Sequence, residues 1–137
     1  MKKLFQTYKR SNDGATAVEF SLVALPFIMM LFGIIEVGRA VWTMNGVQYA
    51  VEQTGRYAAL NSDLTNEEFQ TYAENELSGM RVPSTSLQIS STTFTSSGVN
   101  FIEIEGDYSI SSILTNLLPN NFGNFDFETR VRRPIID

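Results

Sequence analysis

The hydrophobic and polar residues of this 137-residue chain form three successive patterns. An apolar run covers residues 15–35 and contains a single charged residue, Glu19. A helical pattern follows it, and from residue 86 onward apolar positions tend to alternate with polar ones. About 20 apolar residues are needed for a helix to cross the hydrocarbon core of a bilayer. The first pattern therefore predicts one membrane-spanning helix.

The second pattern predicts that this helix continues beyond the membrane as an amphipathic spine. Apolar or small residues recur at helical spacing, at Ala40, Met44, Val47, Val51, Thr54 and Ala58. The opposite face is polar, with Asn45, Gln48, Glu52 and Arg56. One helix over residues 15–60 would be nearly 70 Å long, at about 1.5 Å per residue. We expect half of it in the membrane and half in an exported head.

The rest of the head predicts a short helix and three strands. Thr65 and Glu68 form a capping-box pattern that opens a helix reaching about Leu77. The turn residues 96–98 separate two strand-like segments, 87–94 and 99–110, and residues 127–136 could form a third strand. An apolar cluster at residues 113–118 stops at Pro119. The expected fold is α+β, with a long N-terminal helix, a short second helix and a small antiparallel β-sheet packed on the spine.

The amino-acid composition excludes most kinds of catalytic site. The chain has no cysteine and no histidine, so it lacks thiolates and the commonest general base and metal ligand. Its only lysines, Lys2, Lys3 and Lys9, precede the apolar run. We therefore expect no enzymatic activity, no cofactor and no transition-metal site.

Charge is divided sharply along the chain. Residues 1–14 carry four basic residues and one acid, which is +3, while the remainder carries six arginines and fourteen acids, which is −8. An acidic body argues against nucleic acid as a partner. The positive-inside rule places the basic N-terminus in the cytoplasm and the residues after Arg39 outside, as in a single-pass protein of the bacterial inner membrane with a periplasmic head.

Glu19 distinguishes this segment from an ordinary export signal. A signal peptide cut after Ala40, or an uncleaved anchor, would account for the apolar run but not for a carboxylate inside it. Cleavage after Gly14 would give Ala15 an ammonium group that could pair with Glu19 of a neighbouring subunit. Alternatively, Glu19 is hydrated at the headgroup level, and Gly14 simply follows the capping residues Asn12 and Asp13.

The other polar or helix-bending positions of this helix have two interpretations each. Pro26 removes the amide that would bond to the carbonyl of Leu22, which predicts either a packing kink or a joint used on leaving the bilayer. Glu36 and Arg39 predict a local i,i+3 pair at the outer boundary, or else a contact between subunits.

The residues of this segment resemble a known family. Residues 14–20 (GATAVEF) are similar to the prepilin cleavage motif of type IV pilins. The longer segment 14–42, with its G-x-x-E-x-G-R ending at residues 33–39, resembles the TadE-like proteins of the tight-adherence (Tad) pilus system. Residues 50–60 are similar to the family's continuation. Phe20 stands where the major Tad pilins usually carry tyrosine, which favours the TadE-like branch.

The resemblance implies a pseudopilin or minor pilin with an assembly role. It implies cleavage between Gly14 and Ala15 by a prepilin peptidase, and assembly through Glu19, Phe20 and the helix around them. The expected partners are other pilins or pseudopilins of the Tad system, the inner-membrane pilus platform and the lipid bilayer. The expected organisation is a leader at 1–14, a transmembrane and assembly helix at 15–38, and an exported head at 39–137.

An uncleaved, membrane-anchored accessory module of an envelope complex is the alternative function. The head adds one open question, because Glu103, Glu105 and Asp107 share one strand face. These carboxylates could begin a calcium site, or they form a solvated face that discourages edge pairing. Arg130, Arg132 and Arg133 could meet those acids or a partner.

Overall fold

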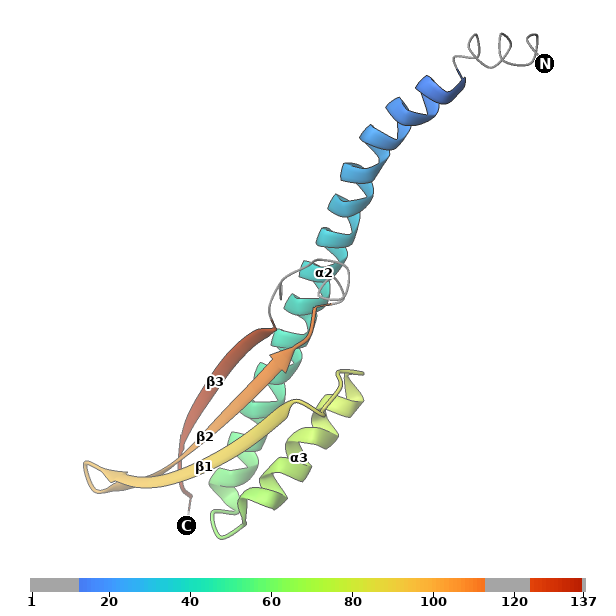
Figure 1. The fold of residues 1–137 in the computed structure, drawn as a ribbon. Coiled ribbons are helices and arrows are strands. Elements are labelled where there is room, and N and C mark those ends of the chain that lie inside the picture. The colour runs from blue at the N-terminus through green and yellow to red at the C-terminus, as the bar shows by residue number, and fades with distance from the viewer. Residues whose placement is uncertain (1–12, 113–123, 137) are drawn as a thin grey trace, which may run out of the picture. The chain divides into compact units, whose positions relative to one another are not determined.

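The computed structural model describes residues 13–112 and 124–136. Its elements, in chain order, are α2 (Asp13–Leu60), α3 (Asn66–Gly79), β1 (Leu87–Ser96), β2 (Val99–Ile110) and β3 (Phe125–Pro134) (Figure 1). The strands form one antiparallel sheet in the order β1-β2-β3. The predicted α+β fold is confirmed. Most of the leader and the apolar cluster at 113–118 lie outside the described residues.

The chain divides into two compact units, and the first ends at Val37. Its described part is the N-terminal portion of α2, which continues through Pro26 without a break. Among the described residues, α2 is the one helix long and apolar enough to cross a membrane, and its most apolar stretch has no buried residue. A helix that is apolar on all sides and unburied matches lipid better than water.

The second unit begins at Gly38 and has its own core. The predicted stripe on α2 is confirmed at Val47, Val51 and Ala58, which are fully or almost fully buried. It is wrong at Met44, which is 44% exposed, whereas Thr43 in the same turn is buried. The buried face turns toward the Thr43 side because the segment after α3 packs there, with Val82 against Gly46.

Two glycines allow α2 to lie directly on the sheet. A Cβ atom added at Gly55 would lie 2.5 Å from Cγ1 of Val131 on β3. One added at Gly106 of β2 would clash with Val51 of α2. Both positions therefore require a residue without a side chain, because close-packed interiors have no room for an extra methyl group.

Helix α3 begins with the predicted capping box. The backbone N–H of Thr65 donates to the Glu68 carboxylate at 2.9 Å, and the Thr65 hydroxyl accepts from the Glu68 N–H. The buried face of α3 consists of Phe69, Ala73 and Leu77. The Gln70 side chain bonds to the Leu87 carbonyl and the Ile89 N–H of β1, at 2.8 and 2.7 Å. The helix thereby protects backbone groups at the free edge of β1.

The hairpin register follows from its turn. Ser96 pairs with Val99, so Ser97 and Gly98 form a two-residue connection, and their φ angles of 53° and 78° are those of a type I′ turn. Strands β1 and β2 were predicted close to their observed bounds. The predicted third strand is confirmed, with observed bounds Phe125–Pro134. Tyr108 of β2 donates its hydroxyl to the Pro83 carbonyl at 2.5 Å.

Candidate assembly helix and charged sheet face

The predicted processing residues lie near the N-terminal end of the described part of α2. Gly14 is exposed, and a Cβ added there would meet nothing within 4 Å, so packing within the described chain does not require glycine. Gly14 and Ala15, on either side of the predicted cleavage site, are both exposed.

Three of the predicted site residues share one helix face. Glu19 is four residues after Ala15, and Pro26 is seven residues after Glu19, which are spacings that return to the same side of a helix. All three are exposed. Phe20, 73% exposed, projects from the adjacent side because one residue advances the helix by a little over a quarter turn.

A shallow hollow of about 440 Å³ lies along α2 beside Pro26. Its lining includes the small residues Ala17 and Ser21. The Ser21 hydroxyl donates to the Ala17 carbonyl at 2.7 Å, so this polar group is already satisfied within the helix. Small residues let the backbones of neighbouring membrane helices approach closely. This part of α2 is therefore suited to contact another helix.

Glu36 and Arg39 differ from the other predicted site residues because neither is fully exposed. Glu36 is 7% exposed and Arg39 is half-buried. Nη2 of Arg39 donates to the Ser111 carbonyl at 2.5 Å, which joins the start of the head's helix to the end of β2. Arg39 therefore has a structural role inside the head. The predicted Glu36–Arg39 pair and its alternative, a contact between subunits, stay predictions.

Arg39 also influences the pKa of Tyr108. Burial raises the pKa of the Tyr108 hydroxyl, and the positive charge of Arg39 partly opposes that rise. The two residues come from α2 and β2, so Arg39 affects both the position and the electrostatics of this strand end. The sequence carried no local signal of this contact, because Arg39 and Ser111 are 72 positions apart.

The acids of β2 meet the arginines of β3 across the sheet. Glu103 is opposite Arg132 and Glu105 is opposite Arg130 in the strand register. The corresponding nitrogen–oxygen distances are 2.8 Å and 3.0 Å. Arg130 also pairs with Glu128 on its own strand. Of the two roles considered for the arginines, contact with these acids is observed for Arg130 and Arg132; exposed pairs of this kind contribute about 0–1 kcal/mol each.

Three carboxylates lie close together at one end of this charged sheet face. The carboxylate oxygens of Glu105, Asp107 and Glu128 lie within 4.8 Å of one another. Burial and a hydrogen bond with Glu128 raise the pKa of the Glu105 carboxyl, and Arg130 opposes that rise. Three carboxylates could offer oxygens to a cation, although Arg130 already engages two of them. The calcium interpretation stays untested.

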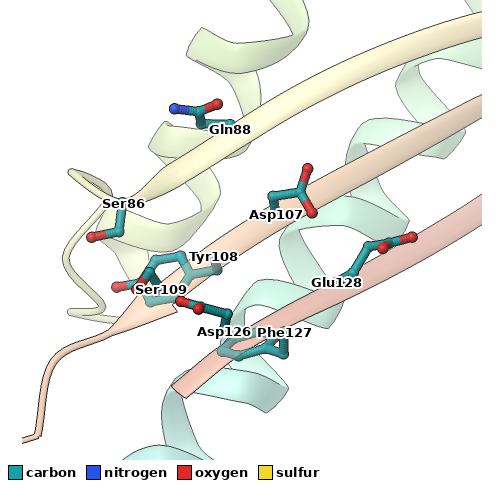
Figure 2. Close-up of a pocket in the computed structure, with 8 residues that line it drawn as sticks. All are labelled: Ser86, Gln88, Asp107, Tyr108, Ser109, Asp126, Phe127 and Glu128. Atoms are coloured by element: carbon teal, nitrogen blue, oxygen red, sulfur yellow. The ribbon is translucent and has the colours of Figure 1, made fainter. Parts of the chain in front are cut away.

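A pocket of about 440 Å³ adjoins these acids. Figure 2 shows Asp107 and Glu128 on adjacent strands, with Asp126 near the ring of Phe127. Ser86 and Gln88 complete the lining from the β1 side. The pocket combines acidic and aromatic groups, but none of the described residues around it forms a recognisable catalytic arrangement.

Sequence reasoning missed an aromatic cluster on the same sheet. The Phe94 and Phe101 rings stack with centroids 5.7 Å apart, and the guanidinium of Arg132 lies 4.7 Å from the centre of the Phe94 ring. The turn at Ser97 and Gly98 could have revealed the phenylalanine pair, because a two-residue connection places Phe94 opposite Phe101. The position of Arg132 depends on the third strand and had no such signal.

The described residues combine an exposed apolar helix with a small α+β head. Residues 14–56 match the family model of the TadE-like proteins, which supports a TadE-like protein of Tad pilus systems. The resemblance found in the sequence is thereby confirmed. No curated protein and no solved structure matches the chain.

The family match sets the broad class of the protein. TadE-like proteins are pilus-related and structural rather than catalytic. The family and the long apolar helix together indicate a membrane-anchored protein associated with other Tad pilus components.

Proposed function

We propose that this chain is an assembly subunit of a Tad pilus, a pseudopilin or minor pilin with no enzymatic role. It is inserted into the inner membrane by α2 with its N-terminus in the cytoplasm and its head in the periplasm. A prepilin peptidase removes residues 1–14, and the remaining helix joins other pilins through helix packing at the pilus platform. The assembled product is either a membrane complex or an extracellular pilus.

The observation that carries this proposal is the position of Glu19. It is exposed on a lipid-compatible helix, on the same face as Ala15 and Pro26. No lysine or arginine occurs between residues 11 and 38, so this stretch of the helix supplies no opposite charge. A carboxylate at the edge of hydrocarbon is costly unless it is neutralised or paired. Cleavage after Gly14 creates the missing cation at Ala15.

Pairing between subunits gives the carboxylate a mechanical role. Within one chain, Ala15 and Glu19 are one helical turn apart. A parallel neighbour displaced by about one turn along the helix axis therefore has its ammonium level with this Glu19. In a low-dielectric environment the pair offsets its desolvation only when both members are present. Correct alignment of neighbouring helices is thereby favoured over misaligned packing.

The test replaces Glu19 by glutamine in the only copy of the chain in the cell. Membrane insertion should be unchanged, because glutamine keeps the size and removes a charge. Mass spectrometry should still find Ala15 at the mature N-terminus, since the cleaved bond is intact. Co-purification with other pilins should fail, because an unpaired buried charge costs about 3–5 kcal/mol. Glu19→Asp, which keeps the charge, should restore part of the assembly.

Each result of this experiment separates the alternatives. A mature N-terminus at Val41 would identify an ordinary signal peptide. An N-terminus at Met1, in cells that have the peptidase, would favour the uncleaved accessory module of an envelope complex. Normal pilus levels with a correctly processed Glu19→Gln chain would show that Glu19 is a hydrated carboxylate and that the charge pair is wrong.

A further inference from the structure

The part of α2 that belongs to the head has two large, exposed apolar residues near its start. Trp42 is the only tryptophan of the chain and is 63% exposed, and Val41 beside it is 52% exposed. Neither side chain belongs to the head's core. Exposed apolar side chains of this size gain free energy when another phase or partner removes them from water.

Their place along the chain indicates what covers them. Trp42 follows the last residue of the uncharged apolar run, Ile35, by seven positions, which is about 10 Å in a regular helix. A residue about two helical turns beyond the end of the apolar run is expected at the depth of the headgroups.

The chemistry of the surrounding segment agrees with a lipid interface. Between residues 37 and 51 the only charged residue is Arg39, and the next acid along the helix is Glu52. Tryptophan is favoured at headgroup depth because its ring is apolar while its N–H can still bond to polar groups. A segment without carboxylates also avoids repulsion from anionic lipids.

We propose that Val41 and Trp42 insert into the phospholipid headgroup layer on the side of the head and set its depth relative to the bilayer. The occupant of this surface is lipid, not another subunit. The inference rests on the membrane span of α2 and is independent of cleavage at Gly14 and of the pilus role. Transfer of the subunit into a filament would then require Trp42 to leave the interface.

Tyr49 provides a matched control within the same helix. It is seven residues beyond Trp42, on the same side of α2, and is also well exposed, at 48%. In a regular helix it lies about 10 Å further from the membrane, beyond the headgroups. An aromatic ring at residue 49 should therefore be surrounded by water, although its local helix environment is similar.

The experiment uses the intrinsic fluorescence of Trp42. The full chain is reconstituted into phosphatidylethanolamine and phosphatidylglycerol vesicles with iodide on both sides. In separate samples, lipids carry bromine either near the headgroup or near the acyl-chain end. Bromine near the headgroup should quench Trp42 several-fold more than deep bromine, and iodide should quench it weakly. In the Trp42→Phe, Tyr49→Trp variant, iodide should quench several-fold more strongly and brominated lipid hardly at all.

Three results would overturn the proposal. Equal iodide quenching at positions 42 and 49 would place Trp42 in water, and strongest quenching by deep bromine would place it in the hydrocarbon. Loss of protection from iodide when the protein is diluted with excess lipid would show that another protein copy covers Trp42. None of these results would affect the mature N-terminus or the assembly defect expected for Glu19→Gln.

Discussion

Glu105 and Glu128 lie on adjacent strands with the guanidinium of Arg130 bonded to both. Two effects raise the pKa of the Glu105 carboxyl, namely its desolvation and its hydrogen bond with Glu128. Together they outweigh the attraction of Arg130, which lowers it. The pKa of Glu105 is raised as a result, so the folded head holds this proton more tightly than the unfolded chain does. Ionisation of Glu105 is therefore less favourable in the folded head than in the unfolded chain, whereas the two carboxylates raise the pKa of Arg130 and favour its charged form.

The raised pKa predicts a pH dependence of stability. Protonation of Glu105 favours the fold, so this contribution is fully present below its ordinary pKa of 4.5 and is lost as the pH rises through the higher folded pKa. Thermal unfolding of the full chain in detergent should show this decrease between pH 4.5 and neutrality. In Glu128→Gln the decrease should be smaller, because the hydrogen bond and the charge that raise the pKa are altered.

Glu103→Gln is the matched control for this measurement. Glu103 lies on the same strand but pairs with Arg132, away from Glu128. Its removal should leave the pH dependence between pH 4.5 and neutrality close to that of the parent chain. An equal change in the two variants would show that general charge, rather than the Glu105–Glu128 contact, causes the effect.

At the scale of elements, the contact between α2 and the sheet depends on the absence of side chains. Gly55 lies against Val131 of β3, and Gly106 lies against Val51 of α2. In most helices an interior glycine lowers stability by about 1 kcal/mol compared with alanine. Here that cost is offset by a closer approach between helix and strands, which buries the valines on both sides.

Gly55→Ala should therefore destabilise the head, although alanine is the better helix former. The added methyl group overpacks the contact with Val131, which costs about 1–3 kcal/mol. Gly38→Ala on the same helix should be neutral or gain up to about 1 kcal/mol, because a Cβ there has no neighbour within 4 Å. Denaturant unfolding of the two variants gives the comparison.

A compensating variant makes the test specific. Val131→Ala shortens the side chain that a methyl group at residue 55 would meet, so the double variant should lose less than the sum of the two single changes. Additive losses would show that the destabilisation by Gly55→Ala does not arise from this contact.

At the scale of the whole molecule, the core and the apolar helix belong to different units. Among the described residues, the buried hydrophobic core runs from Val47 to Ile110, within the unit that begins at Gly38. The described residues of the first unit contribute no core residue and expose most of their large side chains. The head should therefore fold without the membrane segment.

A fragment starting at Arg39 tests this independence. It should show a cooperative thermal transition by circular dichroism, because α2 from residue 39 onward still covers the sheet. It should not join pilins, because it lacks Glu19 and the assembly helix. A fragment that stays in solution without a cooperative transition would contradict the prediction that the head folds independently.

The sequence by itself determined the elements of this protein because their signals are local. The apolar run, the Thr65–Glu68 capping box and the hairpin turn at Ser97–Gly98 each depend on residues within a few positions of one another. Their bounds were predicted to within a few residues. The same local signal carried the family resemblance, since the matched residues 14–56 form part of one helix.

Only the tertiary structure decided which residues meet across the fold. The bond from Arg39 to Ser111 joins residues 72 positions apart, and the bond from Arg130 to Glu105 joins residues 25 apart. The exposure of Met44 likewise depends on where the segment after α3 packs. Such contacts are selected by the shape and burial of whole elements, and a periodic pattern along one element does not contain that information.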